Sequence, residues 1–255
     1  CMFKAKDTGE TKMKDIKELW VRFRLKYLPS KISNQEFCDY MRSKGIAIGK
    51  GTYFFEPATI EIDTQRPWMI SIGEYCKITK GVIILQHDYS RAVLRRAYGE
   101  VIAESKETKV GDNVFIGMNS IILMGAQIGD NSIIGAGSIV SGYIPANSVA
   151  AGNPARVICT LDEFYKKRKN SYIYEAKETA NKFKNIHGVY PTAKQMGAFF
   201  PLYGERSVEW LKDNNIRTNL SGDEEKEILE FYYDSKAQFA SYQEFLNSIS
   251  MGERI

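Results

Sequence analysis

Apolar side chains recur at every sixth position through the middle of the chain. Downstream they are Val110, Ile116, Ile122, Ile128, Ile134 and Val140, and several of them are followed by glycine. The same phase holds upstream at Ile48, Phe54, Ile60, Ile72, Ile78 and Ile84, where only Arg66 breaks the series. A period of six matches neither an amphipathic helix nor the alternation of a simple strand. It predicts a parallel β-helix in which each six-residue unit forms one short side of a triangular coil, with the apolar residue inside.

The phase of the repeat changes between Ile84 and Val110, which predicts an inserted loop at residues 88–109. Segments 46–87 and 110–158 then supply about five coils, with small residues at corners where a side chain would clash. A glycine-rich β-sandwich is the alternative, since the chain holds 20 glycines. We favour the β-helix because six in-phase steps and a matching upstream series are hard to obtain by chance.

The N-terminal segment, residues 1–45, lacks the repeat and is predicted to be helical. Residues 14–28 place five large apolar side chains on one helical face, opposite a basic face: Ile16, Leu19, Trp20, Phe23 and Tyr27. A helix at a membrane surface has this pattern, but a packed apolar stripe beneath a solvated basic face is commoner and is favoured here. Ser33 or Asn34 is expected to cap a second helix that Gly45 ends.

The C-terminal extension, residues 159–255, is also predicted to be helical. We expect a long helix from Leu161 to about His187, and a shorter helix that starts at Pro191-Thr192. Ser221 and Glu224 have the spacing of a capping box before a further helix, and a last helix carries Phe239, Tyr242, Phe245 and Leu246. The aromatic stripes of this extension could form a sugar-binding surface, but such stripes are more often core.

Composition narrows the class of protein. The 255 residues are 44% hydrophobic, which excludes a disordered chain, and no apolar run is long enough for a transmembrane helix. A net charge of +4, from 35 basic and 31 acidic residues, argues against a dedicated nucleic-acid binder. The start of the sequence has no apolar core of a signal peptide, and the four cysteines are scattered without a CxxC pair. We therefore expect a cytoplasmic protein with reduced thiols.

Two stretches carry a family resemblance. The run from Val110-Gly111-Asp112-Asn113 to Ile128-Gly129-Asp130-Asn131-Ser132, and the stretch from Ala151-Gly152-Asn153-Pro154 to Val157-Ile158, resemble the hexapeptide-repeat acyltransferases. The xenobiotic and sugar O-acetyltransferases are the most similar branch. The resemblance implies a mainly β protein with a left-handed parallel β-helix, flanked here by the helical N-terminal segment and C-terminal extension. It also implies a homotrimer with active sites between subunits, and acetyl-CoA as the acyl donor with no metal.

In the resembled family, a histidine at the point where the repeat breaks acts as the general base, and the matching residue here is His87. Its place beside the insertion supports this role, because loops on a rigid repeat scaffold often carry function. The chain has one other histidine, His187, in the predicted helical extension. Neutral imidazole titrates near working pH and can accept the proton of an attacking hydroxyl.

The resemblance also implies residues that bind coenzyme A and the acceptor. An oxyanion donor from a backbone N–H at a coil corner would be that of Gly117, with Gly135 stacked one coil further on. The stretch holding Asn153, Pro154 and Arg156 resembles the region that meets the adenine and phosphate end of coenzyme A, and a guanidinium suits phosphate. Asp88, Tyr89 and Tyr98, in or beside the insertion, are candidates for binding the acceptor. Asp88 is also a candidate for orienting His87, although neighbours on a strand point opposite ways.

The sequence thus predicts an acetyl-CoA-dependent O-acetyltransferase that acts on a hydroxyl of a sugar or related small acceptor, in surface-polysaccharide synthesis. N-acetylation of an amino sugar or nucleotide sugar is one alternative. A non-enzymatic β-helix that serves as a scaffold or binding module is another, although it leaves the His87 insertion unexplained. A zinc-dependent carbonic anhydrase on the same helix is excluded, because that enzyme needs three histidine ligands and this chain has two histidines.

Overall fold

The computed structural model describes residues 9–28 and 31–252, and the chain divides into two compact units between Leu161 and Asp162. The first unit contains two N-terminal helices and the β-helix, and the second contains the C-terminal helices. The segments expected at 1–45 and 46–158 form one unit, because the second N-terminal helix contributes side chains to the β-helix core. The sequence start, Cys1–Asp7, lies outside the described residues.

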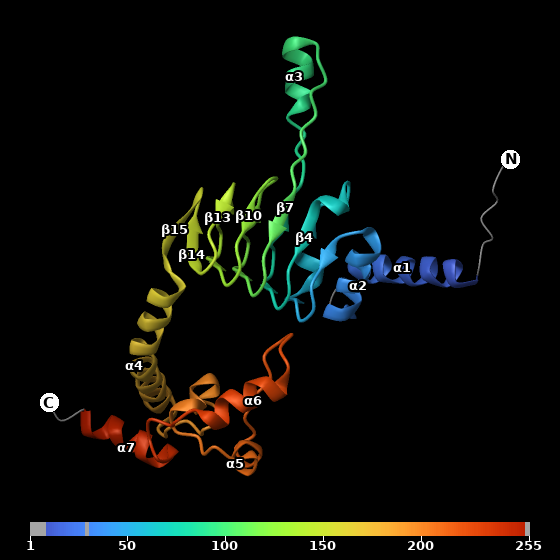
Figure 1. Ribbon diagram of the computed structural model, residues 1–255. Coiled ribbons are helices and arrows are strands. Elements are labelled where there is room, and N and C mark those ends of the chain that lie inside the picture. Colours follow the sequence, from blue (N-terminus) through green and yellow to red (C-terminus); the bar gives the residue numbers. More distant parts are fainter. Residues whose placement is uncertain (1–8, 29–30, 253–255) are drawn as a thin grey trace. The chain divides into compact units, whose positions relative to one another are not determined.

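The first unit is built on a left-handed parallel β-helix with three faces (Figure 1). The first face consists of β1 (Ala47–Ile48), β4 (Ile70–Ile72), β7 (Thr108–Val110), β10 (Gln127–Ile128) and β13 (Tyr143–Ile144). The second face consists of β2 (Tyr53–Phe54), β5 (Lys77–Ile78), β8 (Phe115–Ile116), β11 (Ile133–Ile134), β14 (Ser148–Gly152) and β15 (Ala155–Thr160). The third face consists of β3 (Glu61–Ile62), β6 (Ile83–Ile84), β9 (Ile121–Ile122) and β12 (Ile139–Val140). The strand pairs are parallel except for β14 and β15, which form an antiparallel pair at the C-terminal end of the helix.

The apolar residues of the six-residue repeat form the axis of this helix, as the sequence predicts. Ile78, Ile84, Ile116, Ile122 and Ile134 are each fully buried. Ile116 pairs with Ile134 one coil further on, so equivalent positions stack on each other and exclude water along the whole axis. Burial of each such side chain contributes about 1.5–3 kcal/mol.

The helical ends change the balance of secondary structure without changing the fold class. More residues lie in helices than in strands, because most strands contain two or three residues whereas a single C-terminal helix contains 27. Each side of a coil is short, and the chain must turn before the next side begins. Asn113, Asn131 and Asn147 occupy one such turn in successive coils with positive φ, and their side chains form a hydrogen-bonded ladder.

The break in the repeat at Arg66 has a local cause. The coil between β1 and β4 contains two short 3-10 turns, η2 (Pro57–Thr59) and η3 (Pro67–Met69), each with proline at its start. Proline fixes φ and lacks an N–H, so it suits a turn and cannot continue a strand ladder. The extra residues allow Ile62, on β3, to pair with Ile84, on β6, in the next coil.

The predicted insertion leaves the β-helix after β6 and returns at β7. It contains α3 (Arg91–Tyr98), which ends at Gly99 in the left-handed conformation and projects away from the coils in Figure 1. The neck of the insertion is closed by an antiparallel bridge between His87 and Ser105. Because β7 begins at Thr108, the insertion ends two residues before the predicted boundary at 109.

The N-terminal helices are α1 (Gly9–Tyr27) and α2 (Asn34–Lys44). As predicted, Ser33 caps α2, here in a capping box with Glu36, and Gly45 ends the helix in the left-handed conformation. Phe37, on α2, is buried against Phe54, on β2, with ring centroids 5.0 Å apart. The helix α2 therefore closes the N-terminal end of the β-helix core.

The apolar stripe predicted to be packed on α1 is exposed, and this prediction is wrong. Its residues are 45–66% exposed: Ile16, Leu19, Trp20, Phe23 and Tyr27. Val21 and Leu25 contact the core instead. Two ion pairs, Glu18 with Lys44 and Arg24 with Glu36, hold this other face of α1 against α2. Periodicity identifies an apolar face but not which face has a packing partner in the same chain.

The second unit contains α4 (Leu161–His187), η4 (Gly197–Leu202), α5 (Val208–Asp213), α6 (Glu225–Asp234) and α7 (Tyr242–Gly252). The predicted end of α4 at His187 is confirmed. The aromatic side chains of the second unit do form a core. In this core Tyr203 and Phe245 are fully buried, with ring centroids 5.1 Å apart.

Two local predictions for this unit are wrong. The segment after Pro191 forms turns and the 3-10 element η4, with Pro201 inside it, in place of an α-helix. The helix α6 begins after Glu224, which is its N-cap and makes no side-chain capping bond, so Ser221 does not form a capping box. A serine three residues before a glutamate is a short pattern, and it also occurs at positions that do not cap a helix.

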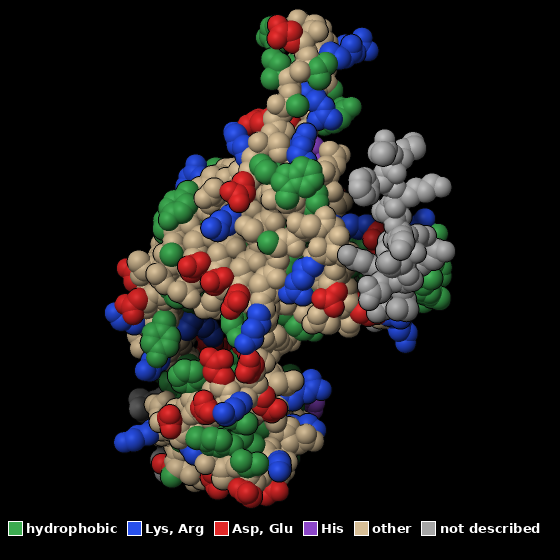
Figure 2. Space-filling view, turned by 45° about the vertical axis from the view of Figure 1, so that its right-hand side comes forward, with side chains coloured by type: hydrophobic (Ala, Val, Ile, Leu, Met, Phe, Trp, Pro, Cys, Tyr) green, Lys and Arg blue, Asp and Glu red, His purple; other side chains and the backbone are tan. Residues whose placement is uncertain are grey.

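Figure 2 shows both basic and acidic side chains exposed at the surface. Within the described residues, no helix combines the length and apolar content needed to cross a bilayer. Cys38, Cys76 and Cys159 are free thiols, and burial raises the pKa of the first two.

Candidate active site

His87 lies where the coil opens into the insertion, and its ring contacts the carboxylate of Asp63. The two residues come from neighbouring coils of the third face, because β3 and β6 pair with Ile62 opposite Ile84. The contact joins His87 Nδ1 to Asp63 Oδ2, and the two side chains are 16% and 7% exposed. A carboxylate at Nδ1 accepts the hydrogen of that nitrogen, which leaves Nε2 with a lone pair that can accept a proton.

A second group of side chains surrounds this pair. Gln86 is fully buried, and its backbone N–H lies 3.4 Å from Asp63 Oδ2. The hydroxyl of Ser105, from the returning segment of the insertion before β7, donates to Gln86 Oε1 at 2.8 Å. The Gln86 side-chain amide also lies 3.2 Å from His87 Nδ1. The neck of the insertion therefore fixes both the carboxylate and the imidazole.

Asp88 does not orient His87. It is fully exposed, and its Oδ1 accepts hydrogen bonds from the hydroxyl and the backbone N–H of Ser90, at 2.7 and 2.9 Å. These two bonds, the hydroxyl bond foremost, lower the pKa of Asp88. The backbone at Asp88 continues into the turn before α3, so its side chain bonds at the start of that helix, and the carboxylate in contact with the His87 ring is that of Asp63.

The remaining acceptor candidates, Tyr89 and Tyr98, lie on the insertion and are 68% and 76% exposed. The guanidinium of Arg91 lies 4.2 Å from the centroid of the Tyr89 ring. In the described residues neither tyrosine contacts His87. An acceptor bound at His87 would therefore have to extend from the imidazole to the insertion to contact either tyrosine.

Gly117 and Gly135 follow β8 and β11 at the same corner of successive coils. The Gly117 N–H donates to the Ile134 carbonyl at 2.8 Å, and the Gly135 N–H donates to the Ala150 carbonyl at 2.8 Å. Both amides thus belong to the ladder between coils, and the expectation that the Gly117 N–H is available to an oxyanion is not met. A Cβ at Gly117 would lie 2.5 Å from the Ala136 nitrogen, so glycine is required for close stacking of the coils.

Asn153 and Pro154 form the exposed turn between β14 and β15. The peptide bond between them is cis. Arg156 follows this turn on β15, is exposed, and donates to the carbonyl of Ala155 at 3.0 Å. Because Gly135 packs against Ala151, which precedes this turn, the turn continues the same edge of the β-helix as Gly117 and Gly135.

The structure therefore divides the predicted site residues between two edges of the β-helix. Gly117, Gly135 and the turn at Asn153-Pro154 lie on the edge between the second and third faces. His87 and Asp63 lie on the edge between the third and first faces. One side of a coil, five to six residues in extended conformation, separates the edges by roughly 15–20 Å.

Sequence analysis missed Asp63, Gln86 and Ser105. The signal for Asp63 was available, because it follows the inward Ile62 as Leu85 follows the inward Ile84. The irregular coil around Arg66 hid this equivalence. Ser105 lies inside the insertion, where no repeat assigns a position.

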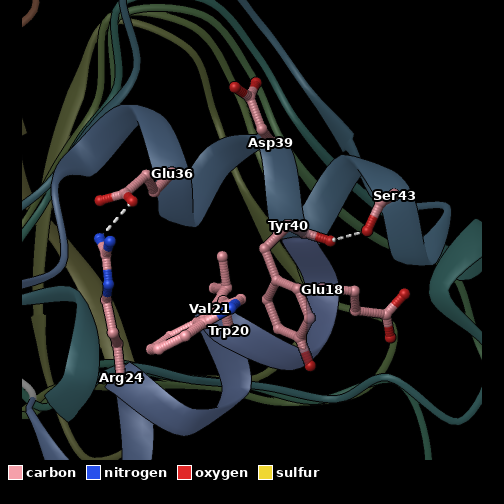
Figure 3. A pocket seen from close by; sticks show the side chains of 8 residues that line it. All are labelled: Glu18, Trp20, Val21, Arg24, Glu36, Asp39, Tyr40 and Ser43. Carbon is pink, nitrogen blue, oxygen red and sulfur yellow. Dashed lines mark hydrogen bonds and ion pairs between the residues drawn. The ribbon is translucent and has the colours of Figure 1, made fainter. Parts of the chain in front are cut away.

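Other features of the described residues lie outside this site. His187, on α4, stacks near Phe183 with ring centroids 4.2 Å apart, and no group of three potential metal ligands occurs in the described part of the chain. A cavity of about 740 Å³ lies between α1 and α2 (Figure 3). Its charged side chains are all paired: Arg24 with Glu36, Glu18 with Lys44 and Asp39 with Arg42. It contains no nucleophile paired with a base.

Comparison with known proteins identifies the family of this chain. Residues 107–142 match the model described as bacterial transferase hexapeptide (six repeats). Protein CapG of Staphylococcus aureus is 35% identical over 146 residues, which cover 57% of this chain and 84% of CapG. The putative acetyltransferase YvoF of Bacillus subtilis is 31% identical over 140 residues, which cover 55% of this chain and 73% of YvoF.

Among solved structures, a maltose O-acetyltransferase from Clostridium difficile is 29% identical with a TM-score of 0.38, over 57% of this chain and 87% of that chain. The repeat, the stacked coils and the extensive match to CapG agree with one another. The chain belongs to the bacterial hexapeptide-repeat transferase family and is an acyltransferase.

Proposed function

We propose that this protein is an acetyl-CoA-dependent O-acetyltransferase that acts on a hydroxyl of a sugar or related small acceptor, in surface-polysaccharide synthesis. The observation that carries the proposal is the contact between Asp63 and His87 Nδ1 at the mouth of the insertion. It supplies an oriented, partly exposed base in a family of acyltransferases.

In the proposed reaction, His87 Nε2 accepts the proton of the acceptor hydroxyl as its oxygen attacks the thioester carbonyl. The carbon–sulfur bond then breaks, and the imidazolium returns the proton to the departing thiolate. The carboxylate of Asp63 stabilises the transient imidazolium and holds the ring in one tautomer. Because the thioester is already activated, no metal and no covalent enzyme intermediate is required. Base catalysis of this kind contributes about 10²–10⁴-fold, equivalent to about 3–5 kcal/mol of barrier.

Coenzyme A is proposed to lie along the edge that carries Gly117 and Gly135. The absence of side chains there allows a pantetheine arm to approach the backbone closely. The exposed turn at Asn153 and Pro154 continues this edge, and the guanidinium of Arg156, at the start of β15, suits the phosphates. The oxyanion requires a donor other than the Gly117 N–H, which is already bonded.

A homotrimer is proposed because the two halves of the site occupy different edges of one β-helix. The glycine edge of one subunit placed against the His87 edge of the next brings the thioester to the base. A single chain separates these edges by the width of a face, roughly 15–20 Å. The proposed active site is therefore incomplete within one chain.

The decisive experiment measures thiol release from acetyl-CoA across a panel of sugars, nucleotide sugars, other alcohols and amines. Acceptor-dependent release with transfer to oxygen, identified by mass spectrometry, supports the proposal. Transfer to nitrogen would instead establish N-acetylation of an amino sugar. If no acceptor stimulates release and coenzyme A does not bind, the protein is a non-enzymatic scaffold and the proposal fails.

A further inference from the structure

The second unit contains a groove that the proposed reaction does not use. The groove has a volume of about 500 Å³ and is lined by the early turns of α4, by η4 and by the segment after α6. Four cationic side chains line it: Arg168, Lys169, Arg206 and Lys236. No acidic side chain belongs to its lining in the part of the chain that the structure describes.

The charges of this groove are only partly compensated. Arg168 forms two hydrogen bonds with Glu175, at 2.7 and 2.8 Å, so its charge is paired. In the described residues, no ion pair involves Lys169, Arg206 or Lys236. The Lys169 ammonium lies 5.5 Å from the centroid of the Tyr165 ring and 3.3 Å from its hydroxyl.

Arg206 has a distinct arrangement. Its guanidinium donates to the carbonyls of Gly204, Pro201 and Ser235 and to the Ser235 hydroxyl, all of which are neutral acceptors. It also lies 4.4 Å from the centroid of the Tyr232 ring. These bonds fix the guanidinium without cancelling its charge, so the floor of the groove carries a rigid positive charge in a partly buried position.

Aromatic rings provide the apolar part of the groove. Tyr165 is 56% exposed, and Tyr172 is half-buried and stacked on Phe199 with centroids 5.4 Å apart. The Tyr172 hydroxyl donates to the Ala198 carbonyl at 2.7 Å, which holds this ring in place. The groove therefore combines an exposed ring, a fixed ring and unpaired cations.

We propose that this groove binds an anionic saccharide, through a carboxylate or phosphate group on the sugar. The apolar C–H face of a sugar ring packs on aromatic rings, while its anionic group is bound by charge-assisted hydrogen bonds from the cations. The volume is within the range of small-molecule sites, about 300–1,000 Å³. A neutral sugar would form no charge-assisted hydrogen bonds with the cations, and a bare anion would not pack on the aromatic rings.

The inference extends beyond the proposed acetyl transfer. The groove is covalently joined to the acyltransferase unit through α4, so it would raise the local concentration of a bound saccharide chain. It would act as an accessory site that retains an anionic polymer. Because its test measures binding and not turnover, it can succeed or fail independently of the proposed function.

The test titrates the full-length protein with three sugars by isothermal calorimetry at low salt: an oligogalacturonate, glucose 1-phosphate and a malto-oligosaccharide of the same length as the oligogalacturonate. We expect at least one of the two anionic sugars to bind more tightly than the neutral one, with affinity that falls as salt rises. Binding of the oligogalacturonate would indicate recognition of a carboxylate, and binding of glucose 1-phosphate would indicate recognition of a phosphate.

The key variant is Lys169→Gln with Lys236→Gln, which removes two exposed charges from the groove. Its matched control is Lys212→Gln with Lys226→Gln. This variant also removes two positive charges, but from α5 and α6, outside the groove. We expect the groove variant to weaken anionic sugar binding about tenfold or more, as expected for a lost charge-assisted bond. Tyr165→Ala is expected to weaken it as well.

Three results would overturn the proposal. The first is that none of the sugars binds, or that the neutral one binds as tightly as the anionic ones. The second is that the control variant loses as much affinity as the groove variant, which would indicate general charge attraction. The third is that inorganic phosphate competes as well as the sugar and Tyr165→Ala has no effect, which would indicate binding of an ion alone.

Discussion

Two edges of one β-helix are built in opposite ways. The edge at Gly117 and Gly135 follows the repeat strictly, and its amides are used to bond one coil to the next. The edge at His87 departs from the repeat through an insertion, and there side chains meet: Asp63 from one coil, Gln86 and His87 from the next, and Ser105 from the returning segment of the insertion. The repeat thus provides a rigid surface, whereas its interruption brings polar side chains together.

The largest effect is expected from His87→Ala. Removal of the base should lower acceptor-dependent thiol release by about 10²–10⁴-fold, while coenzyme A binding and the oligomer mass are retained. His187→Ala, on α4, is the matched control and should keep full turnover. Unchanged turnover in His87→Ala would exclude the imidazole as the base.

Asp63→Asn should have the next largest effect, because the amide cannot stabilise the imidazolium as a carboxylate does. The loss of one charge-assisted hydrogen bond corresponds to about 1.5–3 kcal/mol, or about 10–100-fold in turnover. We expect kcat to fall while the KM for acetyl-CoA changes little, measured by initial rates. A change confined to KM or to thermal stability would show that Asp63 has a structural role alone.

At the opposite edge, Gly117→Ala should act mainly on stability. The new methyl group would lie 2.5 Å from the Ala136 nitrogen, so the coils must separate. Overpacking of this kind costs about 1–3 kcal/mol, measurable by urea unfolding. Gln127→Ala, at an exposed position on β10, is the control and should unfold as the unsubstituted protein does. Equal stability of the two variants would contradict the tight coil contact.

The smallest effect is expected from Asp88→Asn. This carboxylate is exposed and bonds to Ser90 at the start of α3, so its loss should leave turnover and the unfolding midpoint unchanged. Comparison of this variant with Asp63→Asn, which makes the same chemical change, tests which carboxylate serves His87. A loss at Asp88 as large as that at Asp63 would reverse the assignment.

The sequence predicted the β-helix because each repeat position has the same local requirement. Ile116 and Ile134 are buried by stacking on their own equivalents, so their spacing alone identifies the fold. The break in this spacing located the insertion, and the family resemblance singled out His87 beside it. The spacing did not find Asp63, because the coil that carries Asp63 contains two irregular 3-10 turns.

The helical ends show the limit of periodicity. The spacing on α1 correctly identified an apolar stripe, but Trp20 and Phe23 are exposed while Val21 and Leu25 face the core. The face that packs is the one that meets the core through Val21 and Leu25, and it also carries the ion pairs with α2. A pattern along one helix contains no information about such a partner.

By itself, the sequence determined the repeating β-helix, the place of the insertion and the single histidine beside it. These depend on local spacing and on stacking of like residues, which any repeat of this length imposes. Only the tertiary structure decided that Asp63 contacts the His87 ring and that the glycine amides are occupied. It also placed the two sets of residues on different edges. These are contacts between coils, set by register and by where the chain re-enters the helix, and spacing within one segment does not encode them.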